Sequence, residues 1–128
     1  MRKNLSGFTL IEIIIVIIII GVIAGAAVPR FTGTFERVKA SEGKQILLAI
    51  LNAQKIYFLE HGAYSDLGDD LSELDINIPA SQNFNLPNVD NNPDNVAQIE
   101  RKGSTYVLKI KSDGTFTCDG GGCSQIGF

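Results

Sequence analysis

The apolar and polar positions divide the chain into regions with different patterns, and the first region is almost wholly apolar. Residues 13–28 contain no polar side chain, and the apolar run from residue 8 to residue 28 is interrupted only by Thr9 and Glu12. A helix of this length spans roughly 30 Å, which is about the thickness of the hydrocarbon core of a bilayer. The run therefore predicts a helix for a membrane or a filament core over residues 8–29.

The second region is amphipathic. Apolar side chains recur three or four residues apart and predict one buried helical stripe, made of Ile46, Leu47, Ile50, Leu51, Ala53, Tyr57 and Phe58. Charged side chains occupy the other positions and predict a solvent-facing side, made of Glu36, Lys39, Glu42, Lys44, Lys55 and Glu60. His61 and Gly62 have the composition of a last helical turn and its cap. The whole pattern predicts one helix from about residue 8 to about residue 61, whose second half packs on protein.

The remainder of the chain predicts a loop followed by a small sheet. Residues 62–95 are rich in Asp, Asn, Pro and Ser, so we expect an irregular connection that a few apolar side chains attach to the core: Leu71, Leu74, Ile76 and Ile78. Residues 96–118 then predict a meander of three antiparallel strands over 96–101, 105–111 and 115–118, with Tyr106, Leu108 and Ile110 on one face. Such a sheet needs a cover, and the helix supplies it. The predicted fold class is α+β, with a head over residues 30–128.

Charge argues against nucleic acid as a general partner. The 128 residues carry 11 basic and 14 acidic side chains, a net charge of −3, and the balance falls to −5 without Arg2 and Lys3. Four cations near the predicted sheet could form a small basic patch for DNA, namely Arg101, Lys102, Lys109 and Lys111. Charged strand edges more often prevent aggregation, so we expect no nucleic-acid binding.

The two cysteines predict a structural disulfide. Cys118 and Cys123 enclose a short loop with three glycines, and they are the only cysteines in the chain. The spacing differs from a redox C-x-x-C motif, and two thiols with a single histidine do not make a zinc site. Closing so small a loop is worth about 2 kcal/mol and would pin the end of the chain. A disulfide also indicates an oxidising compartment.

No other constellation predicts a cofactor, a metal or catalysis. Acidic residues crowd positions 66–75, and Asp90, Asn92 and Asp94 match the first half of a calcium-binding EF-hand loop. The second half fails, because Asn95 and Arg101 stand where glycine and a bidentate glutamate are needed. We therefore expect a solvated acidic surface. With one histidine, no Ser/His/Asp set and no phosphate-binding loop, the chain is not expected to be an enzyme.

Glu12 is the costly residue of the apolar run, because an ionised group in a membrane requires a partner. It ends the string G-F-T-L-I-E, which follows a short leader with Arg2 and Lys3. This string, with the apolar run behind it, resembles the processing site of the type IV pilins and of their secretion-system relatives, the pseudopilins. The resemblance covers roughly residues 1–60. It implies that a prepilin peptidase cleaves between Gly7 and Phe8, removes the leader at 1–7, and methylates the new amino group of Phe8.

The resemblance also implies roles for other residues of the helix. Glu12 would pair with the amino group of Phe8 on a neighbouring subunit and fix the axial register between subunits. Gly21 and Gly25 lie on one helical face, where small residues let another helix approach closely. Pro29 stands where many pilins have a kink, and proline removes a backbone donor from a helix. The short loop between Cys118 and Cys123 departs from the longer disulfide loop of many pilins, which leaves an adhesive role unsupported.

The expected function is that of a structural subunit of a type IV pilus-like filament. The implied partners are further copies of the chain, the prepilin peptidase, an assembly platform in the inner membrane and, before assembly, the membrane itself. The subunit would begin as a single-pass inner-membrane protein with a cytoplasmic amino terminus and end in an extracellular or periplasmic filament. Three alternatives stay open: a pseudopilin of a type II secretion system, a minor pilin, and a secreted domain with an ordinary signal peptide cleaved near residues 24–26.

Overall fold

The computed structural model describes residues 7–103 and 105–128, and it gives no side-chain environment for Pro29, Arg30 and Thr32. Residues 1–6 of the predicted leader and the side chain of Pro29 therefore lie outside the described residues. The chain forms two compact units, residues 1–34 and residues 35–128, and we call the second unit the head.

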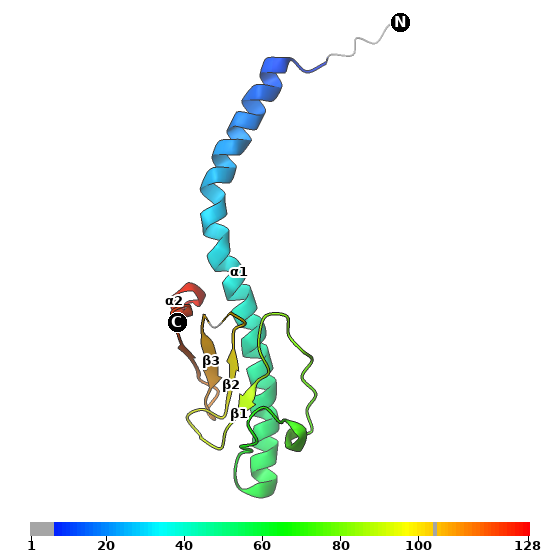
Figure 1. Cartoon of the computed structure of the whole chain (residues 1–128), viewed down its shortest axis with the longest axis vertical. Coiled ribbons are helices and arrows are strands. Elements are labelled where there is room, and N and C mark those ends of the chain that lie inside the picture. Colours follow the sequence, from blue (N-terminus) through cyan, green and yellow to red (C-terminus); the bar gives the residue numbers. More distant parts are fainter. Residues whose placement is uncertain (1–6, 104) are drawn as a thin grey trace, which may run out of the picture. The chain divides into compact units, whose positions relative to one another are not determined.

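One long helix, α1, spans Leu10–His61 (Figure 1). It confirms the predicted helix and begins two residues later than expected. The helix continues through Gly21, Gly25 and Pro29 without a break. The helix ends at Gly62, which has φ of +76° and donates its N–H to the carbonyl of Phe58 at 2.8 Å. Glycine adopts this left-handed conformation without steric cost, which explains why the helix stops there.

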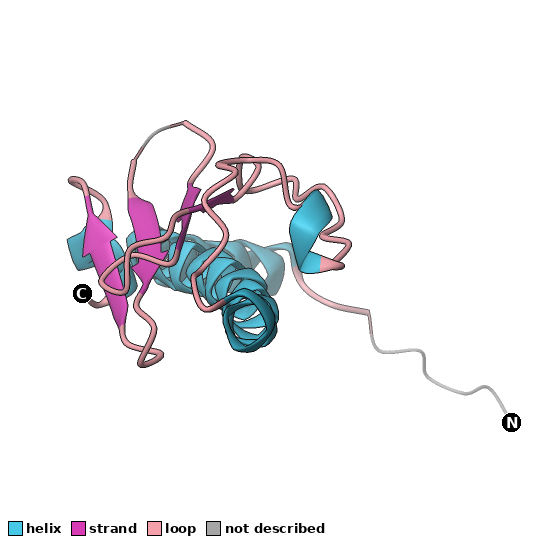
Figure 2. Cartoon of the chain, turned by 90° about the horizontal axis from the view of Figure 1, so that it is seen from below, coloured by secondary structure: helices cyan, strands magenta, loops and turns pink. Residues whose placement is uncertain are grey.

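The sheet of the head has four antiparallel strands in the order β1-β2-β3-β4. Their bounds are Asn88–Val89, Ala97–Glu100, Val107–Ile110 and Phe116–Asp119. The register pairs Ile99 with Leu108 and Leu108 with Cys118. A short helix, α2 (Cys123–Ile126), follows β4, and a single 3-10 turn, η1 (Ser72–Leu74), lies in the irregular segment. The strands lie along one side of α1 (Figure 2).

The core of the head lies between the sheet and the inner stripe of α1. It combines helix residues predicted from the periodicity, such as Leu47 and Ile50, with the predicted inner face of β3, where Leu108 and Ile110 are fully buried. Leu74 is buried, and Leu71, Ile76 and Ile78 pack against the core, so the predicted attachment of the loop is confirmed. Phe58 is a correction, because 42% of its surface is exposed at the edge of the stripe.

Gly43 allows the irregular segment to approach the helix. A Cβ at this position would lie 2.7 Å from Cζ of Phe84 and 3.0 Å from Cδ1 of Leu108. Phe84 is itself 2% exposed, so its ring fills the space that a larger residue would need. The structure shows that Gly43 is a packing position.

Gln54 joins the helix to two other segments. Its side-chain Nε2 donates to the carbonyls of Ser65 at 2.9 Å and Val96 at 3.2 Å, and its Oε1 accepts the N–H of Ser65 at 2.8 Å. Gln54 is fully buried. Burying an amide costs free energy unless it is hydrogen-bonded, and here both ends of the amide are bonded.

Three short elements were missed in the sequence. The strand β1 lies in a stretch of Asn and Pro that predicted turns, and it has only two residues. The turn η1 and the helix α2 are also no longer than one turn. Elements this short have too few residues for a periodic pattern, so they form because the neighbouring chain holds them.

Candidate processing and docking site

The candidate site lies at the start of α1, where the three exposed residues Gly7, Phe8 and Thr9 precede the helix. Gly7 and Phe8 are outside regular structure, and 81% of the surface of Phe8 is exposed. No described atom comes within 4 Å of the position that a Cβ on Gly7 would take. The Gly7–Phe8 peptide bond is therefore exposed, and the packing of the described residues places no restriction on residue 7.

Thr9 and Glu12 form a reciprocal cap at the first turn of α1. The N–H of Thr9 donates to Oε2 of Glu12 at 3.4 Å, and the N–H of Glu12 donates to Oγ1 of Thr9 at 3.3 Å. This is the capping box, in which a threonine and a glutamate three residues later satisfy amide groups that the helix leaves unpaired. Sequence reasoning assigned no role to Thr9, although the spacing T-x-x-E at the start of an apolar run is the signal for this motif.

The cap holds the Glu12 carboxylate at the amino-terminal end of the helix, beside Phe8 and Thr9. A negative charge is favoured there by the partial positive charge of the helix dipole. A capping role alone would account for Glu12 in a wet environment. It does not account for the uninterrupted apolar surface that follows, which only a non-aqueous environment or other apolar helices can cover.

That surface extends over Leu10–Val28, the one candidate membrane span among the described residues, and none of it is buried within the chain. The exposed fraction of its large side chains ranges from 42% at Ile14 to 79% at Leu10. Exposed apolar surface of this size is unstable in water. The segment needs lipid or a bundle of like helices around it.

The small side chains of Ala26 and Ala27 leave a depression on one part of this helix surface. A concavity of about 580 Å³ is lined by Val22, Ile23, Ala26, Ala27 and Phe31. Gly21 and Gly25 have no described atom within 4 Å of an added Cβ, so their face is also open. In helix association, such positions allow the backbones to come close, which strengthens van der Waals contact.

The prokaryotic N-terminal methylation motif matches residues 2–28 of the chain, which include Gly7, Phe8 and Glu12. The chain is also similar to a type IV major pilin and to type II secretion system core proteins. It is 46% identical over 65 residues to the type IV major pilin protein PilA of Myxococcus xanthus, a match that covers 51% of this chain and 30% of PilA. It is 31% identical over 80 residues to the type II secretion system core protein G of Aeromonas hydrophila, which covers 62% of this chain and 55% of that protein.

The chain is also 36% identical over 73 residues to the type II secretion system core protein G of Pseudomonas aeruginosa, a match that covers 57% of this chain and 51% of that protein. In these matches the chain spans between about a third and just over half of the relatives' own lengths. The likeness therefore bears on part of each protein.

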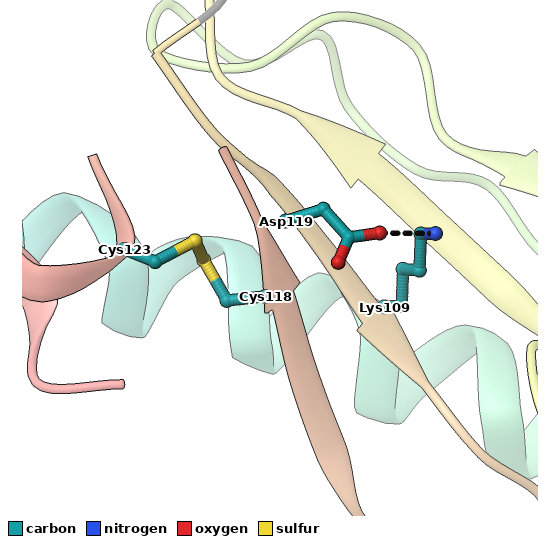
Figure 3. Close-up of a disulfide and its surroundings, with 4 residues drawn as sticks. All are labelled: Lys109, Cys118, Asp119 and Cys123. Atoms are coloured by element: carbon teal, nitrogen blue, oxygen red, sulfur yellow. Dashed lines mark ion pairs between the residues drawn. A yellow bond between two sulfur atoms is a disulfide. The ribbon is translucent and has the colours of Figure 1, made fainter. Parts of the chain in front are cut away.

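The end of the head is held by a disulfide. Cys118 of β4 and Cys123 of α2 are bonded, with their Cα atoms 5.8 Å apart. Figure 3 shows Cys118 directed toward α2, whereas the next residue, Asp119, is directed toward Lys109 on the neighbouring strand. Two consecutive residues of β4 thus connect this strand to α2 through the disulfide and to β3 through the ion pair.

The basic residues of the sheet are largely occupied by carboxylates, which gives no support to a DNA-binding patch. Arg101 pairs with Glu36, Lys109 with Asp119, and Lys111 with Asp94. Among the described residues, no group of three or more His, Cys, Asp or Glu side chains is placed to hold a metal ion.

Two glutamates expected on the solvent side of the helix instead clamp the head together. Arg101 donates from Nε to Oε2 of Glu36 at 3.1 Å and from Nη2 to Oε1 at 3.2 Å. Glu42 accepts from Ser81 Oγ at 2.6 Å and from Asn83 Nδ2 at 2.7 Å. The hydrogen bonds from Arg101, followed by that from Lys39, lower the pKa of Glu36 from 4.5 to about 2. The clamp joins α1 to the irregular segment and to the end of β2.

Replacing Glu36 with Gln is expected to destabilise the head by about 1–3 kcal/mol at pH 7, because it removes a charged partner from a two-point contact with Arg101. The folded-state pKa is depressed, so this stabilisation is complete above about pH 4.5 and is lost as the pH falls toward 2. Urea unfolding of the full chain in detergent, followed by tyrosine fluorescence at several pH values, measures the difference between wild type and variant.

The exposed Glu60 provides the matched control, since Glu60→Gln makes the same chemical change at the end of α1. Its effect on stability at pH 7 should be within about 0.5 kcal/mol. A difference between wild type and Glu36→Gln that does not shrink between pH 4.5 and pH 2 would contradict the assignment of the stabilisation to the Glu36 charge.

Proposed function

We propose that the chain is the structural subunit of a type IV pilus-like filament, made as a precursor in the inner membrane. The observation that carries the proposal is the juxtaposition at the start of α1. An open Gly7–Phe8 bond stands beside one carboxylate, Glu12, which begins a helix surface that is otherwise apolar and uncovered. Processing and assembly give each of these features a use.

In the proposed mechanism, the leader holds the amino terminus in the cytoplasm and α1 crosses the membrane. A prepilin peptidase cleaves after Gly7 and methylates the amino group of Phe8. The new cation is then available to the Glu12 carboxylate of a neighbouring subunit. Two unit charges 4 Å apart attract with about 4 kcal/mol at the effective dielectric constant of a protein boundary, which is enough to select one axial register.

Assembly then exchanges lipid for like helices. An assembly platform in the inner membrane moves the subunit into the filament, where the surface of Leu10–Val28 is covered by other copies. Gly21 and Gly25 would lie at the points of closest approach between helices, and Pro29 would adjust the helix direction. The head, residues 35–128, would form the outer surface of an extracellular or periplasmic filament.

A pseudopilin of a type II secretion system is the second candidate. It is favoured by the relatives named type II secretion system core protein G, which the chain matches over more of its length than it matches PilA. The two functions share processing and helix bundling. Fibres that contain this chain and can be sheared from cells support the pilus, whereas export that depends on the chain without such fibres supports the pseudopilin.

The intact mass of the subunit purified from its host tests the processing step. We expect the mass to lack residues 1–7, to include one additional methyl group, and to lack two hydrogens because of the Cys118–Cys123 disulfide. Fragmentation of the intact protein should place the methyl group on Phe8. A mature chain that begins near residue 27 would show an ordinary signal peptide and overturn the proposal.

A further inference from the structure

The head has an apolar groove with a cationic rim. The groove holds about 240 Å³ between α1, β2 and the irregular segment, and its apolar lining includes Ile46, Ile78, Pro79, Leu86 and Ile99. Leu86 lies in this groove and is 67% exposed. Lys102 lines the same groove, is exposed, and donates from Nζ to the carbonyl of Ser81 at 2.8 Å.

The complementary surface lies elsewhere on the same head. Residues 62–100 contain eight Asp or Glu residues and no Lys or Arg, and five of the eight fall within residues 66–75. Asp66, Asp69 and Asp70 are exposed, and they flank Leu67, which is 42% exposed. We call residues 66–70 the acidic loop. The acidic loop has one apolar side chain, Leu67, between carboxylates. The groove has an apolar lining next to the ammonium group of Lys102, so the two surfaces are complementary in charge.

The two surfaces lie at different levels along α1. Arg101, next to Lys102 in the chain, is bound to Glu36 of the helix. The acidic loop follows Ser65, which is bound to Gln54. These two anchor points are 18 residues of α-helix apart, about 27 Å, whereas Ile46, which lines the groove itself, lies eight residues, about 12 Å, before Gln54. A contact between two different patches on identical molecules is heterologous and, when it does not close into a ring, generates a filament.

We propose that the groove around Leu86 and Lys102 receives the acidic loop of a second copy of the chain. Leu67 of that copy enters the apolar groove, and its flanking carboxylates face Lys102. The inference rests on the proposed function, since it assumes that identical subunits assemble, and it adds a contact between heads to the contacts of the apolar helices. Charge complementarity of this kind fixes which surfaces meet and in which register.

Charge reversal in full-length chains expressed in the pilus-forming host tests the contact. Lys102→Glu and Asp69→Lys should each lower the sheared filament fraction at least about fivefold, because each places like charges at the interface. The double variant restores opposite charges and should return to within about twofold of wild type, because the two changes couple only if the residues meet. Lys55→Glu, an equal charge change on an exposed helix position, serves as the control.

The amount of processed subunit in the membrane reports folding and cleavage for every variant. Filaments from both single variants at the wild-type level would overturn the groove contact and leave the proposed function standing. A double variant as defective as the single variants would also overturn it. If the wild-type chain itself enters no filament, the proposed function fails, and that result is distinct from both.

Discussion

Glu12→Gln subunits are expected to be cleaved normally and to enter filaments at less than about a tenth of the wild-type level. The amide oxygen of glutamine can still accept the N–H of Thr9, so the reciprocal cap and the helix start are retained. The charge that would pair with the amino group of Phe8 on a neighbour is lost. A tenfold loss corresponds to about 1.4 kcal/mol, well within the value of an ion pair shielded from water. Immunoblots of the sheared fraction and the membrane fraction measure both outcomes.

Thr9→Ala is the matched control, because it removes the hydroxyl of the cap and leaves the charge of Glu12. Loss of a helix cap costs about 1 kcal/mol, and packing around the helix can absorb that cost. Filament yield should therefore stay close to that of wild type. An equal loss of filaments in Thr9→Ala and Glu12→Gln would mean that Glu12 acts through the helix cap rather than through its charge.

Gly7→Val is expected to accumulate as the uncleaved precursor in the membrane, with almost no mature subunit. The structure makes this variant informative, because no described atom lies within 4 Å of an added Cβ at residue 7. The chain itself tolerates the larger side chain, so a block must arise in the peptidase. The precursor and the mature subunit differ by seven residues and separate on a gel or by intact mass.

Gly33→Val controls for the general effect of replacing glycine with valine, since an added Cβ there also meets no described atom. It should be cleaved like wild type. Equal processing of Gly7→Val and wild type would count strongly against cleavage after Gly7.

The sequence predicted those parts of the fold that depend on repeated patterns. The alternation around Leu108 and Ile110 and the helical spacing around Leu47 and Ile50 each extend over several residues, so the buried faces could be assigned. Contacts between distant single residues could not. Glu36 and Arg101 are 65 residues apart, and nothing local in the chain indicates that they meet.

The residues of the candidate site could be named from the sequence more completely than the contacts of the head, because they are close together in the chain. Gly7, Phe8 and Glu12 lie within six residues of one another. The role of Thr9 was nevertheless missed, although its spacing from Glu12 was visible. The structure shows the Glu12 carboxylate in a helix cap with Thr9, a role that does not depend on the apolar run behind it.

The buried amide of Gln54 has a consequence for the order in which the head folds. Its three hydrogen bonds reach Ser65 and Val96, which are 11 and 42 residues away, so they form only when the loop and the sheet are both in place. A head with an open loop would bury an unpaired amide, and such intermediates are unfavourable. The irregular segment and the sheet should therefore unfold together. Amide hydrogen exchange should give the amide of Ser65 and the amides of the neighbouring strand β2 one common opening free energy.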